Sequence, residues 1–306
     1  MANSTLLQLV NRAENEMGLP AAATIIANTA VDVVQQLALL NAVGNELQRE
    51  FQWQAQTIEY RFTTVFKTYT GTVTSGSTSV TAMSSIVGLT SDSTFSAVGA
   101  GIPQDTYVTT AAGATVTLSQ AADSTPTPPV SITFTQTKYT VPTDFDRLVD
   151  RTDWDKSKHW EMLGPETGQQ WQWLKSGYIS TGPRVRFRML GTYFQIWPPI
   201  GVADVLGFEY VAKNWVTITA GTLPSKASFT VDTDTCIYPD QLMVNGLKYW
   251  YLDAKGLGTM KAREDWQRQK SIAFANDGGS AILSMAPRLS SVLISATNIP
   301  DSGYGT

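Results

Sequence analysis

One stretch decides the fold, residues 68–137, which read TYTGTVTSGSTSVTAMSSIVGLTSDSTFSAVGAGIPQDTYVTTAAGATVTLSQAADSTPTPPVSITFTQT. This stretch contains no Lys or Arg, and its only acids are Asp92, Asp105 and Asp123. Of the 22 basic residues in the chain, four precede it and 18 follow it. A composition that differs so sharply from its surroundings predicts a structural unit of its own.

Short apolar runs separated by Gly and by Ser or Thr fill this unit. Such β-branched runs with regular turn residues are typical of a small all-β sandwich or barrel. The prolines of STPTPPVS mark the last loop, because proline cannot donate to a central strand ladder. We expect strands near 70–75, 78–82, 94–98, 106–111, 115–119 and 130–136.

The segments on either side of the unit are also strand-like but carry charge. TIEYRFTTVFK (57–67) alternates before it, and KYTV (138–141) follows it. We therefore interpret 68–137 as an insertion into a hairpin of a host domain, whose two strands run into and out of the insertion. Close termini make such insertions tolerable.

Helical spacing dominates the two ends of the host. Apolar residues recur at helical intervals over 6–17, with Asn3 or Ser4 available as the N-cap, and a second helix is expected over 31–51. A short helix is expected near 165–176. Pro239 and Asp240 open a last helical region that runs to about 276, with a break at the two glycines of 256–258.

Three further strands are expected within the host, RVRFRML, TYFQIWP and VLGFEYVAKNWV. The predicted fold class is therefore α+β. A helical-bundle host with a β-hairpin or small sheet (1–67 and 138–280) carries an inserted all-β, sandwich-like domain (68–137) and an extended C-terminal arm (281–306).

Composition excludes several classes of chemistry. The single cysteine rules out an internal disulfide, and the single histidine rules out a multi-histidine metal centre. A net charge of -4 argues against broad coating of duplex nucleic acid. No apolar run reaches the length of a membrane span, and Arg12, Glu14 and Glu16 interrupt the place of a signal-peptide core. We expect a protein without membrane contact that stays inside the cell until it is released.

The candidate catalytic groups have simpler structural interpretations. His159 lies beside no nucleophile motif, so we expect a loop or surface histidine. The acidic run DFDRLVDRTDWD (144–155) is interleaved with basic residues and lacks the order of a calcium loop, which favours ion pairs within a loop or with a neighbouring subunit. DTDT (232–235) favours a turn over a metal site. We expect no enzyme activity, no cofactor, and no catalytic or metal-binding residue.

Two groups of residues are candidates for binding a partner. In RVRFRM, alternation puts three arginines on one face of a strand, which is either solvated or faces an acidic partner or a nucleic-acid channel. The segment after 278 is poor in charge and too short to fold alone, so it could gain order along a partner. The candidates are Arg184, Arg186, Arg188, Ile282, Leu283, Met285, Arg288, Leu289, Val292, Leu293 and Ile294. All nine tryptophans lie outside 68–137, which predicts an aromatic-rich host core and aromatic anchors at its interfaces.

An ordered set of host segments carries a family resemblance. In chain order the segments are LLQLVNRAENEMGLP, LQREFQWQAQ, YTVPTDFDRLVDRT, MLGTYFQIWPPI, LGFEYVAKNWV and DTDTCIYPDQLMVNGLKYWYLDAKG. Together they resemble the head-to-tail adaptor (connector) proteins of tailed bacteriophages, over about 1–67 and 138–280. Residues 68–137 resemble small β-modules of phage virion proteins, and many adaptors lack such an insertion.

The resemblance implies a structural role. Adaptors of this family form a homo-oligomeric ring, usually of twelve copies, under the portal protein, and they continue the channel for double-stranded DNA without reading its sequence. By resemblance, the C-terminal arm would reach the portal and the opposite face would receive the tail tube or nozzle protein. Apart from the resemblance, the Ser/Thr-rich faces of the insertion suit a polar contact with tail fibres or with neighbouring insertions. The implied location is the neck of the virion, after assembly in the host cytoplasm.

Two other classes of function stay open at this point. An adhesin would act through the β-insertion and use the host as a mount. A cell-wall-cleaving tail enzyme would use a pair of carboxyl groups, one with a raised pKa in a cleft. Binding of host cells by 68–137 alone would favour the first, and activity on peptidoglycan would favour the second.

Overall fold

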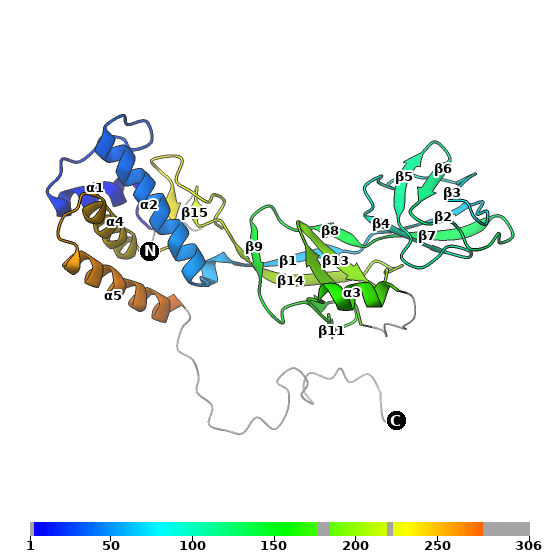
Figure 1. Ribbon diagram of the computed structural model, residues 1–306. Helices are drawn as coiled ribbons and strands as arrows, with labels where there is room; N and C mark the ends of the chain where they lie inside the picture. Colours follow the sequence, from blue (N-terminus) through cyan, green and yellow to red (C-terminus); the bar gives the residue numbers. More distant parts are fainter. Residues whose placement is uncertain (1–2, 177–183, 219–222, 278–306) are drawn as a thin grey trace, which may run out of the picture.

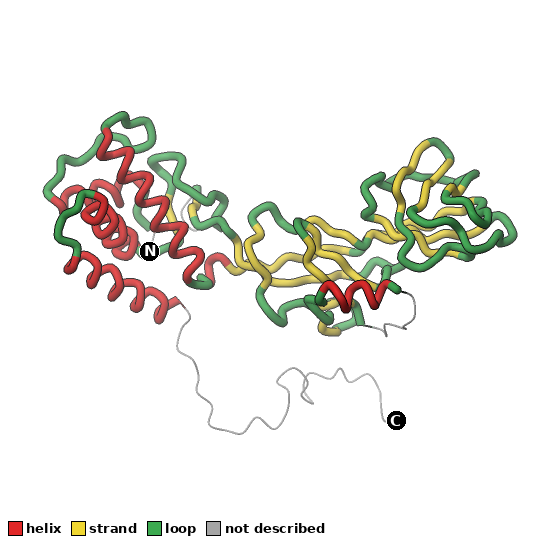
Figure 2. The backbone as a smooth tube through the Cα atoms, in the orientation of Figure 1, coloured by secondary structure: helices red, strands yellow, loops and turns green. Residues whose placement is uncertain are grey.

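The computed structural model describes residues 3–176, 184–218 and 223–277. The molecule is elongated, with a helical unit at one end, two antiparallel sheets in the middle and a β-module at the other end (Figure 1). Figure 2 shows that the helices gather in the helical unit, apart from one short helix beside the central sheets. The candidate functional residues lie on these three parts and at the places where the parts meet.

The helical unit contains α1 (Leu6–Met17), α2 (Val31–Glu50), α4 (Asp240–Ala254) and α5 (Met260–Asp277). The predicted first helix is confirmed, but its N-cap is Thr5, whose side chain forms a capping box with Gln8. Asn3 and Ser4 instead form hydrogen bonds near the start of α4. The Asn3 side chain donates to Cys236 O, and the Ser4 amide donates to the Asp240 carboxylate at 3.0 Å. The predicted break between the last two helices is also confirmed, after Ala254.

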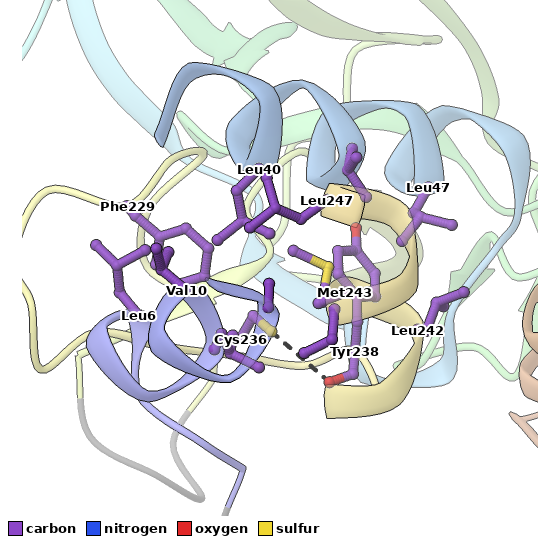
Figure 3. Close-up of a cluster of buried hydrophobic side chains, with 14 of the residues drawn as sticks. Leu6, Val10, Leu40, Leu47, Phe229, Cys236, Tyr238, Leu242, Met243 and Leu247 are labelled. Carbon is purple, nitrogen blue, oxygen red and sulfur yellow. Dashed lines mark hydrogen bonds between the residues drawn. The ribbon is translucent and has the colours of Figure 1, made fainter. Parts of the chain in front are cut away.

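The core of this unit joins segments from both ends of the sequence (Figure 3). The short strands β15 (Val216–Thr217) and β16 (Thr235–Cys236) pair beside it, and the short 3-10 helix η1 (Gln54–Gln56) leads out of it. Buried side chains come from α1, α2, α4 and the segment before α4, and include Leu6, Val10, Leu40, Leu47, Phe229, Cys236, Tyr238, Leu242, Met243 and Leu247. Residues before 57 and residues from 215 onwards therefore form one core. The central sheets and the module are built from the chain between these two segments.

The central part has two sheets. One contains β1 (Thr57–Thr63), β14 (Val205–Ala212), β10 (Trp154–Asp155) and β11 (Trp160–Glu161) in that order, with β9 (Phe145–Leu148) also paired to β14. The other has the order β12 (Arg186–Leu190), β13 (Tyr193–Trp197), β8 (Lys138–Thr140). Stacked rings join them, because the ring centroid of Phe194 lies 5.0 Å from Phe187 and 4.9 Å from Phe208. The short helix α3 (Gly168–Lys175) lies beside these sheets (Figure 1).

The predicted fold class is therefore wrong. In the described residues the chain is mostly small antiparallel sheets with five α-helices, where a helical-bundle host with a hairpin or small sheet was expected. The reason is non-local pairing: β9 and β10 are short and polar, and each becomes a strand because distant β14 offers it a ladder. Their local sequence resembles a loop.

The β-module has two three-stranded sheets around its own core. One has the order β2 (Phe66–Gly71), β7 (Val130–Gln136), β4 (Phe95–Gly99), and the other β3 (Ser79–Val80), β6 (Thr115–Leu118), β5 (Val108–Ala112). All six predicted strands occur, although the first begins earlier and the second is shorter than expected. The buried cluster between the sheets, which includes Ile132 and Phe134, draws its members from residues 73–134 only. The boundaries at 67/68 and 137/138 stay a prediction, and β2 crosses the first of them.

The predicted host hairpin around the module is not formed. The two flanking strands belong to different sheets, since β1 pairs with β14 and β8 pairs with β13. The chain enters and leaves the module through the antiparallel pair of β2 and β7. The change of partner follows Thr64, which is still bonded to the segment before β14: its amide donates to Asp204 O at 2.8 Å, and its hydroxyl donates to Val202 O at 2.6 Å. The alternating sequence of 57–67 runs through this break without marking it.

Candidate functional site

The predicted partner-binding residues of the arm lie outside the described residues. They are Ile282, Leu283, Met285, Arg288, Leu289, Val292, Leu293 and Ile294. The candidates that the structure describes are the three arginines at β12, the junction between the module and the central sheets, and an exposed apolar surface on the helical unit.

The arginines at β12 differ in their surroundings. Arg184 is exposed, whereas Val185 and Phe187, on the opposite face of the strand, are buried, as alternation predicts. Arg186 donates to Glu166, with Nη1 2.5 Å from Oε1, and only 8 % of the Glu166 side chain is exposed. Arg188 is half-buried beside Gly168, at the start of α3. Of the three, Arg184 is the one best placed to meet a partner.

The acidic run supports local structure. Asp155 Oδ1 accepts hydrogen bonds from the Ser157 and Lys158 amides, both at 3.0 Å, which closes the turn between β10 and β11. Lys158 forms an ion pair with Asp204, with Nζ 2.6 Å from Oδ2. His159 is exposed in this turn, which confirms the prediction of a surface histidine. Arg147 forms an ion pair with Asp146, at 2.9 Å, but both residues lie in strand β9 and not in a loop.

Asp153 is the exception in this run. It is buried, and its Oδ1 has no hydrogen-bond partner among the described residues. Burial, with a further contribution from the Asp150 charge, raises the pKa of Asp153 to about 7.

The DTDT segment forms turns, as predicted. The Asp232 carboxylate accepts from the Ile25 and Ile26 amides at 3.2 and 2.9 Å. Asp234 accepts from the amides of Thr230 and Val231 and pairs with Lys226, with Nζ 2.8 Å from Oδ1. In the described ranges, no three His, Cys, Asp or Glu side chains come together as ligands for a metal ion.

A cleft lies where the module meets the central sheets, and we call it the junction cleft. It contains two adjoining cavities of about 180 and 320 Å³, which share Ser96, Asp105 and Trp197. The smaller cavity is also lined by Ser93, Tyr107, Thr137, Lys138, Trp171, Lys175, Gln195 and Ile196. The larger is also lined by Ala97, Val98, Ile102, Pro103, Gln104, Pro198 and Pro199.

Two ammonium groups face the smaller cavity. Lys175, the last residue of α3, pairs with Asp105 of the module, with Nζ 2.6 Å from Oδ1, and this ion pair joins module and host. Lys138, the first residue of β8, lies with Nζ 5.6 Å from the centroid of the Tyr107 ring. Burial and repulsion from Lys175 lower the pKa of Lys138. Sequence reasoning missed this cleft because its charged residues come from separate elements and form no local motif.

The exposed apolar surface lies where α2 begins and α4 leads into α5, and we call it the end patch. It comprises Val31, Val34, Leu257 and Met260, with exposed fractions of 80, 49, 56 and 81 %. An ion pair between Asp32 and Lys255, at 2.8 Å, holds the two segments together. Large apolar side chains this exposed on two adjoining segments are typical of interaction surfaces.

Within 3–176, 184–218 and 223–277, no helix is both long enough and apolar enough to cross a bilayer. Neither a protein-family model nor a curated protein sequence matches the chain.

Proposed function

We propose that this chain is a head-to-tail adaptor of a tailed bacteriophage. Copies of it form a ring on the portal protein, receive the tail tube or nozzle protein on the opposite face, and continue the channel through which double-stranded DNA passes. The module projects from the ring and is available to tail fibres. In this proposal the chain is a structural part of the virion neck.

The observation that carries the proposal is the position in the fold of the six segments that resemble adaptor proteins. The first, second and last of them supply α1, the end of α2, and β16 with α4, whose side chains share one core. The other three supply β13 and β14, which are inner strands of the two middle sheets, and β8 and β9, which pair with them. Segments that are scattered in sequence therefore build the core of the helical unit and the middle sheets. This supports treating the six segments as one set.

The end patch supports self-association. A monomer gains nothing from Val31 and Met260 at 80 and 81 % exposure, whereas a neighbouring copy could bury both. Val31 and Met260 are each the first residue of a helix, α2 and α5. Aspartate is favourable at that position because it complements the helix dipole. A charge can therefore be introduced into the end patch without weakening the helices.

The test combines portal binding with matched variants. Purified chain is mixed with portal rings and sedimented, and the amount bound per portal is measured. Val31→Asp and Met260→Asp should each lower the bound amount at least about tenfold, since each places a charge in an apolar contact. Val87→Asp is the control, because Val87 is 74 % exposed in the module, away from the end patch. A wild-type chain that stays monomeric and never sediments with the portal contradicts the proposal.

A further inference from the structure

The junction cleft has two halves of different chemistry. The smaller cavity holds the ammonium groups of Lys138 and Lys175. The larger, which shares Trp197 with it, is bounded by Val98, Ile102 and three prolines, and 52 % of Val98 is exposed. A ligand that fills both halves must carry an anionic group beside an apolar one.

The two ammonium groups in the smaller half are compensated to different degrees. Asp105 is paired with Lys175. Lys138 makes no ion pair with any carboxylate that the structure describes; the charges of Asp92 and Asp105 act on it from longer range, and burial outweighs them. An anion placed between the two lysines would give Lys138 a direct partner.

A side-chain amide also lines the smaller cavity. It belongs to Gln195 of β13, which is only 8 % exposed. The amide offers both a donor and an acceptor, so it can bind the backbone or carboxylate of a ligand beside Lys138.

The shape and chemistry favour a peptide over a sugar. The larger half combines aliphatic and proline side chains with Ser96, Gln104 and Asp105, and Trp197 is 6 % exposed, so its ring offers little face on which a sugar could stack. We propose that the junction cleft binds an extended acidic peptide segment of a partner protein. Its Asp or Glu carboxylate lies between Lys138 and Lys175, and the next apolar side chain lies against Val98 and Ile102. This proposal is independent of ring formation.

The probe is the peptide trifluoroacetyl-Gly-Ser-Asp-Leu-Ser-Gly-amide, whose blocked ends leave one carboxylate. Binding to the full chain is followed by broadening of the fluorine signal in NMR at low salt. The wild type should bind this peptide, and should bind the versions with Asn for Asp or Ser for Leu about tenfold less tightly, given the usual strength of charged hydrogen bonds. Equal binding of the Asn version overturns carboxylate recognition, and equal binding of the Ser version overturns the apolar contact.

Variants of the chain that should lower or raise the affinity for the peptide test the residues assigned to binding. Lys138→Gln should lower the affinity about tenfold, and Lys138→Arg should restore most of it. Asp105→Asn should raise the affinity, because it releases Lys175 for the ligand. Lys67→Gln is the control, since Lys67 lies in β2 but does not line the cleft. Thermal unfolding of each variant checks that the fold is intact, and unchanged affinity in a folded Lys138→Gln variant overturns the proposal.

Two competing ligands test whether the cleft binds something other than a partner peptide. Glucuronate supplies the carboxylate on a sugar, and it should displace the probe only at concentrations far above that of the Asp-Leu peptide. A peptide of residues 296–303, ATNIPDSG, carries an acid near an apolar residue of this chain itself. If glucuronate competes as well as the probe, the ligand is a sugar acid. If ATNIPDSG binds more tightly than the probe, the occupant is this chain's own segment. Either outcome overturns the assignment to a partner peptide.

Discussion

The Tyr139 hydroxyl accepts a hydrogen bond from the Val65 amide, at 3.0 Å, and so joins the strand that leaves the module to the segment that enters it. The same hydroxyl donates to Gln136 O at 2.9 Å, and the Tyr139 ring lies 4.4 Å from that of Phe62. Burial raises the pKa of Tyr139 to about 12, so the hydroxyl keeps its proton. One side chain therefore connects both crossings between module and host.

Tyr139→Phe should lower the free energy of unfolding by about 1–2 kcal/mol, because it removes two hydrogen bonds and leaves the ring in place. Equilibrium unfolding in urea measures the loss. Tyr193→Phe is the matched control, since the Tyr193 hydroxyl has no hydrogen bond to a residue that the structure describes. Equal stability of Tyr139→Phe and the wild type would show that the hydroxyl does not hold the junction.

Gly44→Ala should destabilise the helical unit by about 3 kcal/mol, as overpacking of a core does. A Cβ at Gly44 would lie 2.3 Å from the Trp215 ring, which is fully buried and stacked 5.6 Å from Tyr238. Gly258→Ala is the control, because a Cβ there meets nothing within 4 Å. Thermal unfolding compares the two, and an equally small effect of both substitutions would contradict this packing.

Asp153 makes stability depend on pH. Its folded-state pKa is raised to about 7 from an ordinary value of 3.8, so the folded state binds the proton more tightly than the unfolded state. Stability from this group is therefore present below about pH 4 and is lost as the pH rises towards 7. Asp150 and Glu161, the charged groups that face it, act in the same direction.

Asp153→Asn should stabilise the protein at pH 8 by on the order of 3 kcal/mol and have little effect at pH 4. Urea unfolding at the two pH values measures the difference. Asp155→Ala gives the opposite sign at pH 8, because it removes the acceptor of two backbone amides. Destabilisation by Asp153→Asn at pH 8 would mean that the charged carboxylate is stabilised in the fold.

Substitutions of two arginines at β12 should have different effects, one on portal binding and one on stability. Arg184→Glu should reduce portal binding and leave the melting temperature unchanged, because Arg184 is exposed. Arg186→Glu should lower the melting temperature, since it places a second negative charge beside Glu166, whose side chain is 8 % exposed. Sedimentation with portal rings and thermal unfolding measure the two effects. Unchanged binding by Arg184→Glu would assign that side chain to a solvated surface.

Local signals in the sequence were enough for the elements that local physics determines. Helix α1 ends where predicted because Gly18, with φ 77°, supplies the left-handed C-cap. The module strands follow β-branched runs separated by turn residues. In both cases the information lies within a few neighbouring residues.

The remaining features depend on partners that are distant in sequence. Strands β9 and β10 form because β14 lies beside them, and the flanks 57–63 and 138–140 pair with strands more than 50 positions away. The junction cleft depends on Lys138, Lys175 and Asp105 meeting across three elements. No periodicity or motif records such a meeting, so neither the central sheets nor the cleft could be derived from pattern alone.

Electron microscopy of portal rings incubated with the full chain tests the central proposal most directly. The account predicts an added ring of density on one face of the portal, with the helical units side by side around an open channel and the modules at the periphery. Val31→Asp should remove this ring. Portal rings that stay bare while the wild-type chain remains monomeric in the same sample would contradict the account.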